Sequence, residues 1–430
     1  MHYYSLNNKN HKVTFQQAVI NGLAPDKGLY FPESITPLPN SFFDEIENLS
    51  NEEIAFQAIK QFVGDEIPET VSKQIISETI NFDFPCVKVE DEVYSLELFH
   101  GPTMAFKDVG ARFMSRCLAY FNQNSEKKNT VLVATSGDTG GAVASGFLGV
   151  KGANVVILYP SGKVSDIQER QLTTLGQNIT ALEVDGVFDD CQDFVKQAFL
   201  DNDLKHKNLT SANSINIARW LPQMFYILFA YKQLKKYNKE IILSCPSGNF
   251  GNICAGIMAK KLGLTIAHFV ASTNANDTVP RYLQNGNYEP KPTIATISNA
   301  MDVSNPSNFV RIEELYYNDL NEFKKDFSSY TFSDEETKST IKNVYETTHY
   351  VLEPHGAVGY LGLKKEMKNH KNSIGVLLET AHPIKFLDVV EPILNIKLEI
   401  PNQIESVLNK EKKSVKINNY NDLKAFLLKG

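Results

Sequence analysis

The segment VLVATSGDTGGAVA, residues 131–144, decides how this chain is expected to fold. Four apolar residues at 131–134 predict a buried strand, and small residues from Ala142 onward predict a helix. Between them, Ser, Gly, Asp and Thr form a turn that leaves backbone N–H groups at a helix start, where an anion can bind. An ordinary capped helix after a strand explains the same residues, so this segment alone leaves both interpretations open.

The same strand, turn and helix pattern recurs from about residue 87 to residue 270. Short Val, Ile and Leu runs that alternate with amphipathic helices indicate a doubly wound, mainly parallel α/β sheet. Strands are expected at 130–134, 154–158, 179–184, 240–244, 267–270 and 373–378. Helices are expected at 13–20, 108–120, 334–350 and 357–367. Residues 272–330, rich in Asn, Pro and Ser, are expected to be irregular, and residues after Pro401 to form an exposed fringe.

Bulk composition excludes several classes of protein. A chain of 430 residues is long enough for two or three domains. Its net charge of −7 gives no basic surface for nucleic acid, although a local cationic pocket remains compatible with it. The five cysteines lack CxxC spacing, which predicts reduced thiols, a cytoplasmic location and no metal site. No secretion signal and no apolar run of ~18 residues is found, so no membrane contact is expected.

Lys107 stands where an apolar run and the turn Gly101-Pro102 meet a helix pattern. The positive end of the helix dipole and the apolar neighbours 104–106 both disfavour its charged form and lower its pKa. A lysine in such a place can act as an amine nucleophile and form a Schiff base. A surface lysine at a helix start is the plainer explanation of this residue by itself.

A second strand and turn, ILSCPSGNFGNICAG at residues 242–256, has Gly248 and Gly251 on either side of Asn249-Phe250. Consecutive N–H groups in such a turn can hold a phosphate. Neither the lysine of a nucleotide P-loop nor the three-glycine dinucleotide pattern is present, so a phosphorylated cofactor fits better. A tight turn without any ligand is the alternative.

Two further motifs add a hydroxyl and an imidazole. The strand IGVLLE, residues 374–379, ends in Thr380, which is expected to face the crevice where α/β sheets bind ligands. His355 follows Glu353-Pro354 and is equally compatible with a packed structural histidine and a catalytic one. A lysine amine, a phosphate loop, a second anion turn and a strand-end hydroxyl together match the needs of pyridoxal phosphate.

These motifs closely resemble those of the threonine synthases, pyridoxal-phosphate enzymes of fold type II with the tryptophan-synthase-β-like fold. The resemblance is to the long-chain bacterial and fungal form and covers nearly the whole chain. FHGPTMAFKD at 99–108 is its most specific part, and GLAPDKGLY at 22–30, Met301-Asp302 and 307–309 follow the family's order. Lys27 stands where the family usually has glycine, and Asn252 where it often has aspartate.

The resemblance implies an N-terminal α/β domain and two doubly wound, mainly parallel domains. The N-terminal domain is expected at residues 1–95, and a smaller mobile domain at 126–235. The larger cofactor domain is expected at 96–125 and 236–430, with an irregular insertion at about 272–345. Lys107 would hold the cofactor as an imine, Thr380 would face its ring nitrogen and Asp138 its phenolic oxygen. Its 5′-phosphate would be held by Gly248, Asn249, Phe250, Gly251 and Asn252.

The reaction that the resemblance implies is a γ-elimination followed by β-addition of water, which turns O-phospho-L-homoserine into L-threonine and phosphate. Lys163 is the expected cation for the substrate phosphate, and the other expected substrate ligands are Ser136, Thr139, Asn213, Ser214 and Arg219. No obligate protein partner is expected. A phospholyase with the same cofactor motifs is the alternative enzyme. A non-catalytic scaffold is disfavoured because Lys107 and the 248–252 loop are intact.

Overall fold

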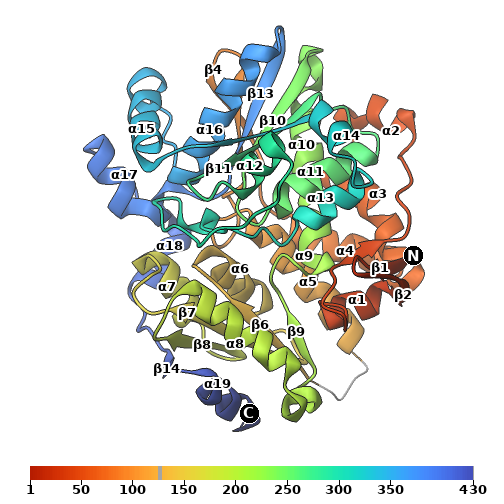
Figure 1. Cartoon of the computed structure of the whole chain (residues 1–430), viewed down its shortest axis with the longest axis vertical. Coiled ribbons are helices and arrows are strands. Elements are labelled where there is room, and N and C mark those ends of the chain that lie inside the picture. Colours follow the sequence, from red (N-terminus) through yellow and green to blue (C-terminus); the bar gives the residue numbers. More distant parts are fainter. Residues whose placement is uncertain (124–127, 430) are drawn as a thin grey trace.

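The computed structural model describes residues 1–123 and 128–429. Figure 1 shows an upper lobe built on a six-stranded sheet and a lower lobe built on a five-stranded sheet. The N-terminal segment lies beside the upper lobe, and the C-terminal helix lies at the foot of the lower lobe. The α/β fold class expected from the sequence is confirmed.

The six-stranded sheet carries the upper lobe. In order across the sheet its strands are β12 (Phe327–Thr331), β11 (His268–Thr273), β10 (Glu240–Pro246), β13 (Ser373–Glu379), β5 (Val93–Glu97) and β4 (Cys86–Glu90). All pairs are parallel except β4 with β5. The helix α16 (Pro354–Glu366) packs on the three central strands β10, β11 and β13. Every residue of β13 is buried, which explains its unbroken apolar run.

The lower lobe is built on a fully parallel sheet. In order its strands are β14 (Val415–Ile417), β8 (Ile179–Val184), β7 (Ala153–Pro160), β6 (Asn129–Ala134) and β9 (Leu209–Ser211). The helix α8 (Phe188–Leu200) packs on β6 and β7, and α6 (Asp138–Phe147) contacts the same two strands. The segment 131–144 spans the end of β6, the turn after it and the first part of α6, as the sequence predicted.

The N-terminal segment has its own small antiparallel sheet, in the order β2 (Asn8–Thr14), β1 (His2–Ser5) and β3 (Tyr30–Pro32). The helix expected at 13–20 begins at Phe15, because the Thr14 hydroxyl accepts a hydrogen bond from Gln17 N as an N-cap. Helices of this segment are α1 (Phe15–Asn21), α2 (Asn40–Asp44), α3 (Asn51–Val63) and α4 (Glu69–Thr79). The last of them packs on α5 (Lys107–Asn122).

Strand pairing differs from the predicted domain ranges in two places. The range 1–95 cuts through β5, and both β4 and β5 belong to the six-stranded sheet. Residues after Pro401 are largely exposed, as expected of an α/β fringe, but β14 pairs with β8 and so belongs to the lower sheet rather than to the range 236–430. The predicted boundary between residues 125 and 126 lies outside the described residues, and the domain division itself stays a prediction.

The stretch 272–330 is more regular than its composition suggests. It contains β12, which forms the edge of the upper sheet, and three short helices, α12 (Thr278–Asn285), α13 (Phe309–Leu315) and α14 (Leu320–Lys325). The other α-helices of the described residues are α7 (Asp166–Thr173), α9 (Ile217–Trp220), α10 (Met224–Leu234), α11 (Gly251–Lys261), α15 (Asp334–Thr348), α17 (Leu387–Leu394), α18 (Asn402–Leu408) and α19 (Tyr420–Lys429).

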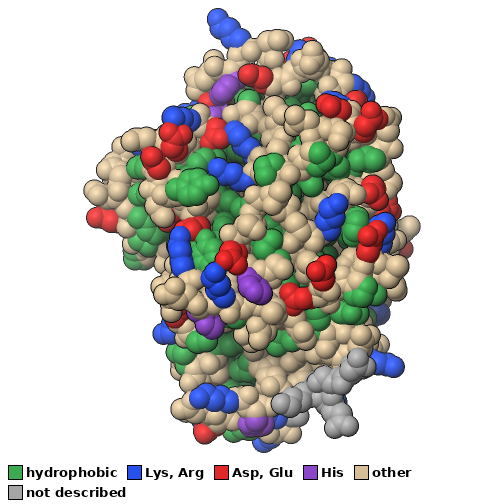
Figure 2. Space-filling view, turned by 90° about the vertical axis from the view of Figure 1, so that its right-hand side faces the viewer, with side chains coloured by type: hydrophobic (Ala, Val, Ile, Leu, Met, Phe, Trp, Pro, Cys, Tyr) green, Lys and Arg blue, Asp and Glu red, His purple; other side chains and the backbone are tan. Residues whose placement is uncertain are grey.

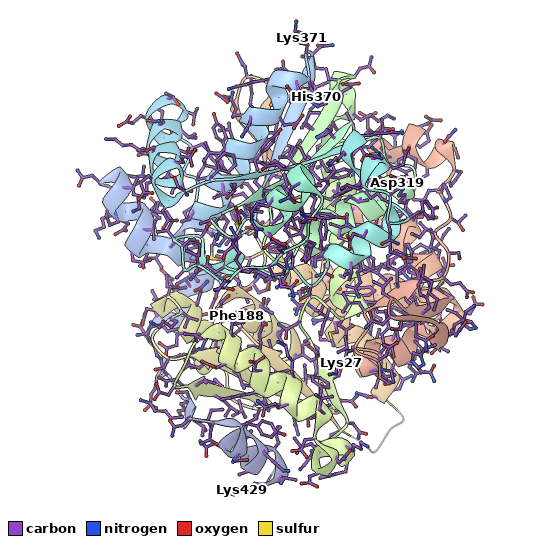
Figure 3. All side chains as sticks on the ribbon, viewed as in Figure 1. Lys27, Phe188, Asp319, His370, Lys371 and Lys429 are labelled. Carbon is purple, nitrogen blue, oxygen red and sulfur yellow. The ribbon has the colours of Figure 1, made fainter. Side chains whose placement is uncertain are left out.

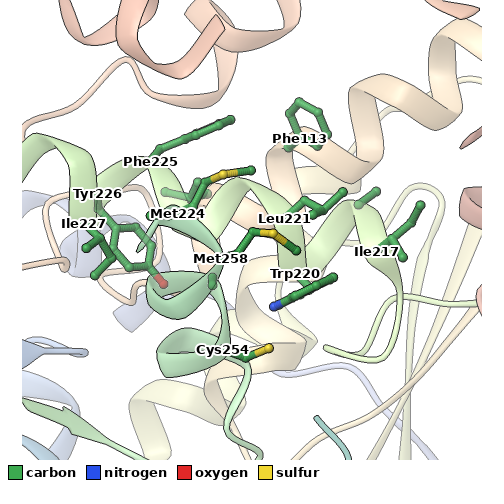
Figure 4. Close-up of a cluster of buried hydrophobic side chains, with 14 of the residues drawn as sticks. Phe113, Ile217, Trp220, Leu221, Met224, Phe225, Tyr226, Ile227, Cys254 and Met258 are labelled. Carbon is green, nitrogen blue, oxygen red and sulfur yellow. The ribbon is translucent and has the colours of Figure 1, made fainter. Parts of the chain in front are cut away.

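The main core lies where α5, α9, α10 and α11 meet (Figure 4). Trp220, at the end of α9, is fully buried, stacks on Phe31 and has the Arg311 guanidinium 4.3 Å from its ring centre. Figure 2 shows acidic and basic side chains mixed over one face of the molecule, in keeping with the small net charge. Among the described residues, no helix is long and apolar enough to cross a membrane.

Candidate active site

A cavity lies where the two lobes meet, beyond the carboxyl ends of β6, β10 and β13. Its empty space, counted with its open mouth, is about 910 Å³. The upper lobe contributes the loop after β10, and the lower lobe contributes the turn after β6 and Phe188. Figure 3 places Phe188 at the end of the lower lobe that faces the upper one. Ligands bind in this position in open α/β sheets.

Lys107 is the first residue of α5 and lines the cavity. Its side chain is 19% exposed, and its Nζ atom lies 4.6 Å from the Phe106 ring centre and 3.9 Å from Asp138 Oδ2. Burial lowers the pKa of the Lys107 amine, and the nearby charge of Asp138 opposes that shift. The neutral amine, the form that acts as nucleophile or base, is thus easier to reach than in an exposed lysine.

Asp138 is held ionised by a lysine that the sequence did not single out. Its Oδ1 atom lies 2.6 Å from Lys385 Nζ and accepts a hydrogen bond from Gln168 Nε2 at 3.0 Å. Burial opposes ionisation of Asp138, but the charges of Lys385 and Lys107 hold its pKa well below the usual range. The Lys385 side chain is fully buried and also donates to Thr103 O at 2.9 Å.

The loop after β10 has the geometry of a phosphate cradle. In the described part of the chain, the backbone N–H groups of Gly248, Asn249 and Phe250 donate to no protein acceptor. Phe250 has a φ of +59° and leads into the first turn of α11, where further N–H groups lack partners. A Cβ at Gly248 would lie 2.8 Å from Met301 Cα, so only glycine fits. Free donors at the start of a buried eleven-residue helix suit a phosphate group.

Thr380 follows β13 directly and lines the cavity beside the loop after β10, the strand that pairs with β13. Its carbonyl accepts a hydrogen bond from Phe106 N at 2.9 Å, which ties it to the residue before Lys107. His355 also lines the cavity, and its Nε2 atom accepts from Ala300 N at 3.1 Å while Nδ1 faces Glu353. His355 therefore positions the 299–301 turn that closes one side of the cavity.

The other expected residues are all brought to the cavity except one. Ser136, Thr139, Asn213, Ser214 and Arg219 line it. Lys163 does not: it is exposed, on the turn after β7, and lies outside the lining. Arg219 is buried, donates to Ala212 O, and has an Nε atom without a partner among the described residues. Burial lowers the pKa of Arg219 to about 10, so it stays a cation.

Asp302 lines the cavity, and the sequence offered no reason to expect a shifted pKa for its carboxyl group. It accepts hydrogen bonds from Thr296 Oγ1 at 2.7 Å and Asn274 Nδ2 at 2.9 Å. Burial raises the pKa of Asp302 to about 6, although these hydrogen bonds act in the opposite direction. Met301-Asp302 stood out in the sequence only through its resemblance to a family motif. Lys385 lies two residues after Pro383, and nothing in that position of the sequence predicts its contact with Asp138.

Three family models match the chain. They are "Pyridoxal-phosphate dependent enzyme" over residues 84–379, "Threonine synthase N terminus" over residues 2–80, and "Threonine synthase, C-terminal" over residues 356–427. Together they leave few residues of the chain unmatched.

Relatives of known name match over the full length. The chain is 46% identical to the threonine synthase of Haemophilus influenzae, with 100% of both chains covered. The crystal structure of threonine synthase from Escherichia coli superposes with a TM-score of 0.94 at 41% identity, covering 100% of both chains. A pyridoxal-phosphate-bound threonine synthase from Brucella melitensis gives 0.93 at 32% identity, covering 99% of this chain and 98% of that one. The chain therefore belongs to the threonine synthases, a family of pyridoxal-phosphate-dependent enzymes.

Proposed function

We propose that the chain converts O-phospho-L-homoserine and water into L-threonine and phosphate, as the last step of threonine biosynthesis in the cytoplasm. The observation that carries the proposal is that Lys107, the 248–252 loop and Thr380 line one cavity in a threonine-synthase chain. The cytoplasmic location is supported by the five free cysteines, four of which are buried.

Three parts of the cavity would hold pyridoxal phosphate. Lys107 Nζ would bind its aldehyde carbon, the N–H groups of residues 248–252 would bind its phosphate, and the Thr380 hydroxyl would face its ring nitrogen. When bound, the cofactor supplies a conjugated ring that accepts electrons from the substrate's Cα. Asp138, held ionised by Lys385, keeps a fixed negative charge 3.9 Å from the lysine amine.

Proton transfer is assigned to Lys107. Because burial lowers its pKa, the amine can take a proton from the substrate's Cα and return protons to the carbon chain. Asp138 opposes the pKa shift, so the protonated amine remains accessible as the acid for the return step. Closure of the lower lobe on the upper one would exclude water until the phosphate has left.

Arg219 is assigned to the substrate phosphate, with Asn213 and Ser214 beside it. Its positive charge and its place on the cavity wall support this role. Ser136 and Thr139, on the anion turn before and within α6, are assigned to the substrate carboxylate. Lys163, which the sequence favoured for the phosphate, is exposed and would need the lobes to move before it could contribute.

One assay tests the reaction. With O-phospho-L-homoserine, the purified enzyme should release threonine and phosphate in equal amounts, and Lys107→Ala should release neither. Arg219→Lys should raise KM at least about tenfold, roughly 1.4 kcal/mol of binding. The control Lys163→Ala should leave KM within about twofold, a change below ~0.5 kcal/mol. Formation of 2-oxobutanoate in place of threonine would show a phospholyase instead.

Gly248 tests the phosphate cradle separately. A Cβ there would lie 2.8 Å from Met301 Cα and 3.0 Å from Ala300 O, so Gly248→Ala must displace the backbone. We expect the Kd for pyridoxal phosphate to rise at least about tenfold, measured by absorbance titration of the apoenzyme. Gly251→Ala is the matched variant, since its Cβ would come no closer than 3.4 Å to any atom. Equal losses in the two variants would contradict the assignment.

A further inference from the structure

Two histidines and a glutamate form a cluster away from the active-site cavity. One ligand atom from each of His268, Glu366 and His370 lies within 4.8 Å of the others, the one such group of His, Cys, Asp or Glu found in residues 1–123 and 128–429. His268 begins β11, so the cluster lies at the amino ends of the upper sheet's strands. The cavity lies at their carboxyl ends. Figure 3 places His370 at the top of the molecule, far from the junction of the lobes.

The Nε2 atom of His268 is buried and has no hydrogen-bond partner. Its side chain is only 9% exposed, and Nε2 lies 3.7 Å from Glu366 Oε2, too far for a hydrogen bond. An orphaned buried nitrogen is costly and calls for a partner. Two donors that share a tetrahedral ion at about 2.1 Å lie about 3.4 Å apart, so the observed spacing is close to that of two ligands of one metal.

The Glu366 carboxylate is already oriented by its surroundings. Its Oε2 atom accepts hydrogen bonds from Ser328 Oγ at 2.6 Å and Tyr330 OH at 2.7 Å, and Oε1 accepts from Asn369 Nδ2 at 3.2 Å. Such outer partners fix the ligands of metal sites. Oε1 also lies 3.1 Å from His370 Nε2, four residues further along the chain.

Both imidazoles are suited to metal binding. The neutral imidazole ring is the commonest transition-metal ligand among side chains. The ring centres of His268 and His370 lie 5.1 Å apart, and each ring has a nitrogen within 4.8 Å of a Glu366 carboxylate oxygen. The His370 side chain is 23% exposed, which leaves a path to solvent for an ion and for a water ligand.

We propose that His268, Glu366 and His370 bind a divalent transition-metal ion of the Zn²⁺ class, with solvent as the fourth ligand. Two imidazoles and one carboxylate suit Zn²⁺ or Co²⁺, whereas Mg²⁺ and Ca²⁺ prefer oxygen ligands. The ion would join the start of β11 to the end of α16 and to the turn that precedes β13. The ion would act apart from the catalytic reaction, because no residue of the cluster lines the catalytic cavity.

The test uses untagged holoenzyme dialysed against Zn²⁺, with metal content measured by mass spectrometry. One zinc ion per chain is expected, together with a rise in Tm that Mg²⁺ does not produce. His370→Ala should weaken zinc binding at least about tenfold and abolish the rise in Tm. This variant is chosen because His370 is partly exposed and its loss leaves Glu366 with three hydrogen-bond donors.

The matched control is His206→Ala, which removes an exposed histidine of the lower lobe and should bind zinc as the parent does. Glu366→Gln is the second variant, and it should also lose zinc. The proposal is overturned if the holoenzyme retains no zinc, if His370→Ala retains as much zinc as the parent, or if His206→Ala loses it equally. Threonine formation by His370→Ala at the parent rate is expected, and it separates this site from the active site.

Discussion

Lys385 and Asp138 make a buried ion pair whose two charges depend on each other. A buried carboxylate that loses its cationic partner destabilises a fold by about 3–5 kcal/mol. We therefore expect Lys385→Met to lower the free energy of unfolding by about 3 kcal/mol, measured by urea denaturation. The control is Lys364→Met, because Lys364 pairs with Glu90 at the surface and should contribute less than about 1 kcal/mol. Similar losses in both variants would refute the importance of the buried pair.

Asp302 gives the stability a defined pH dependence. Its pKa of about 6 in the folded chain exceeds the ordinary aspartate value of about 3.9 in the unfolded chain. Between those values the folded state holds a proton that the unfolded state has lost. The stabilising contribution is therefore complete below about pH 4 and is lost as the pH rises to about 6.

Asp302→Asn removes this titration. The free energy of unfolding of the parent, minus that of Asp302→Asn, should fall as the pH is raised from about 4.5 to about 7. Urea denaturation at several pH values measures it. A difference that stays constant over this range would mean that Asp302 does not titrate there.

For single residues, the sequence predicted a place in the cavity where a local strand, turn or helix motif sets the position of the side chain. Lys107, Gly248 and Thr380 each stand at the end of a strand or the start of a helix, and all reach the cavity. Lys385 was not predicted, because its contact with Asp138 depends on how the two lobes meet. Lys163 follows β7 and is exposed beside the turn at Gly162, outside the cavity lining, so its contact with the substrate phosphate stays a prediction.

The helix α19, at the edge of the lower lobe, is expected to contribute to the stability of that lobe. Leu423 is fully buried against the lower core, which also contains Val184 and Ile417, whereas Leu428 is 43% exposed. We expect Leu423→Ala to lower the free energy of unfolding by about 2–4 kcal/mol and Leu428→Ala by less than about 0.5 kcal/mol. Denaturant unfolding compares the two. Equal, small effects would mean that α19 does not pack on the lobe in solution.

Helices and strands were predictable where the spacing of apolar residues and the length of the segment indicated the same type of element. The strand at 179–184 was predicted with its observed ends, and the strand predicted at 373–378 ends one residue later. The edge strand β12 and helices α12 to α14 were missed, because polar residues such as Asn274 are used there for hydrogen bonds between loops. The pairing of β14 with β8 joins segments far apart in the chain, and no local pattern contains that information. The cluster of His268, Glu366 and His370 escaped the sequence for the same reason.

The cofactor site lies between the two lobes of the molecule. Binding of pyridoxal phosphate should therefore stabilise both lobes against unfolding. A ligand present at about 100 times its Kd contributes about 2.7 kcal/mol. We expect removal of pyridoxal phosphate to lower Tm, measured by differential scanning calorimetry on the holoenzyme and apoenzyme at equal concentrations. Pyridoxal, which lacks the phosphate, should restore much less of the loss. Full recovery with pyridoxal would indicate that the 248–252 loop contributes little to binding.

The pairing of β14 with β8 also bears on how this protein is made. A ribosome completes β8 long before it reaches β14, and at ~5–20 residues per second the interval is on the order of tens of seconds. During that time the nascent lower sheet has an open strand edge, which is a known template for wrong pairing between chains. Chaperones that shield such edges should therefore matter for the biogenesis of the lower lobe, and equally for the upper one, whose strand β5 waits for β13.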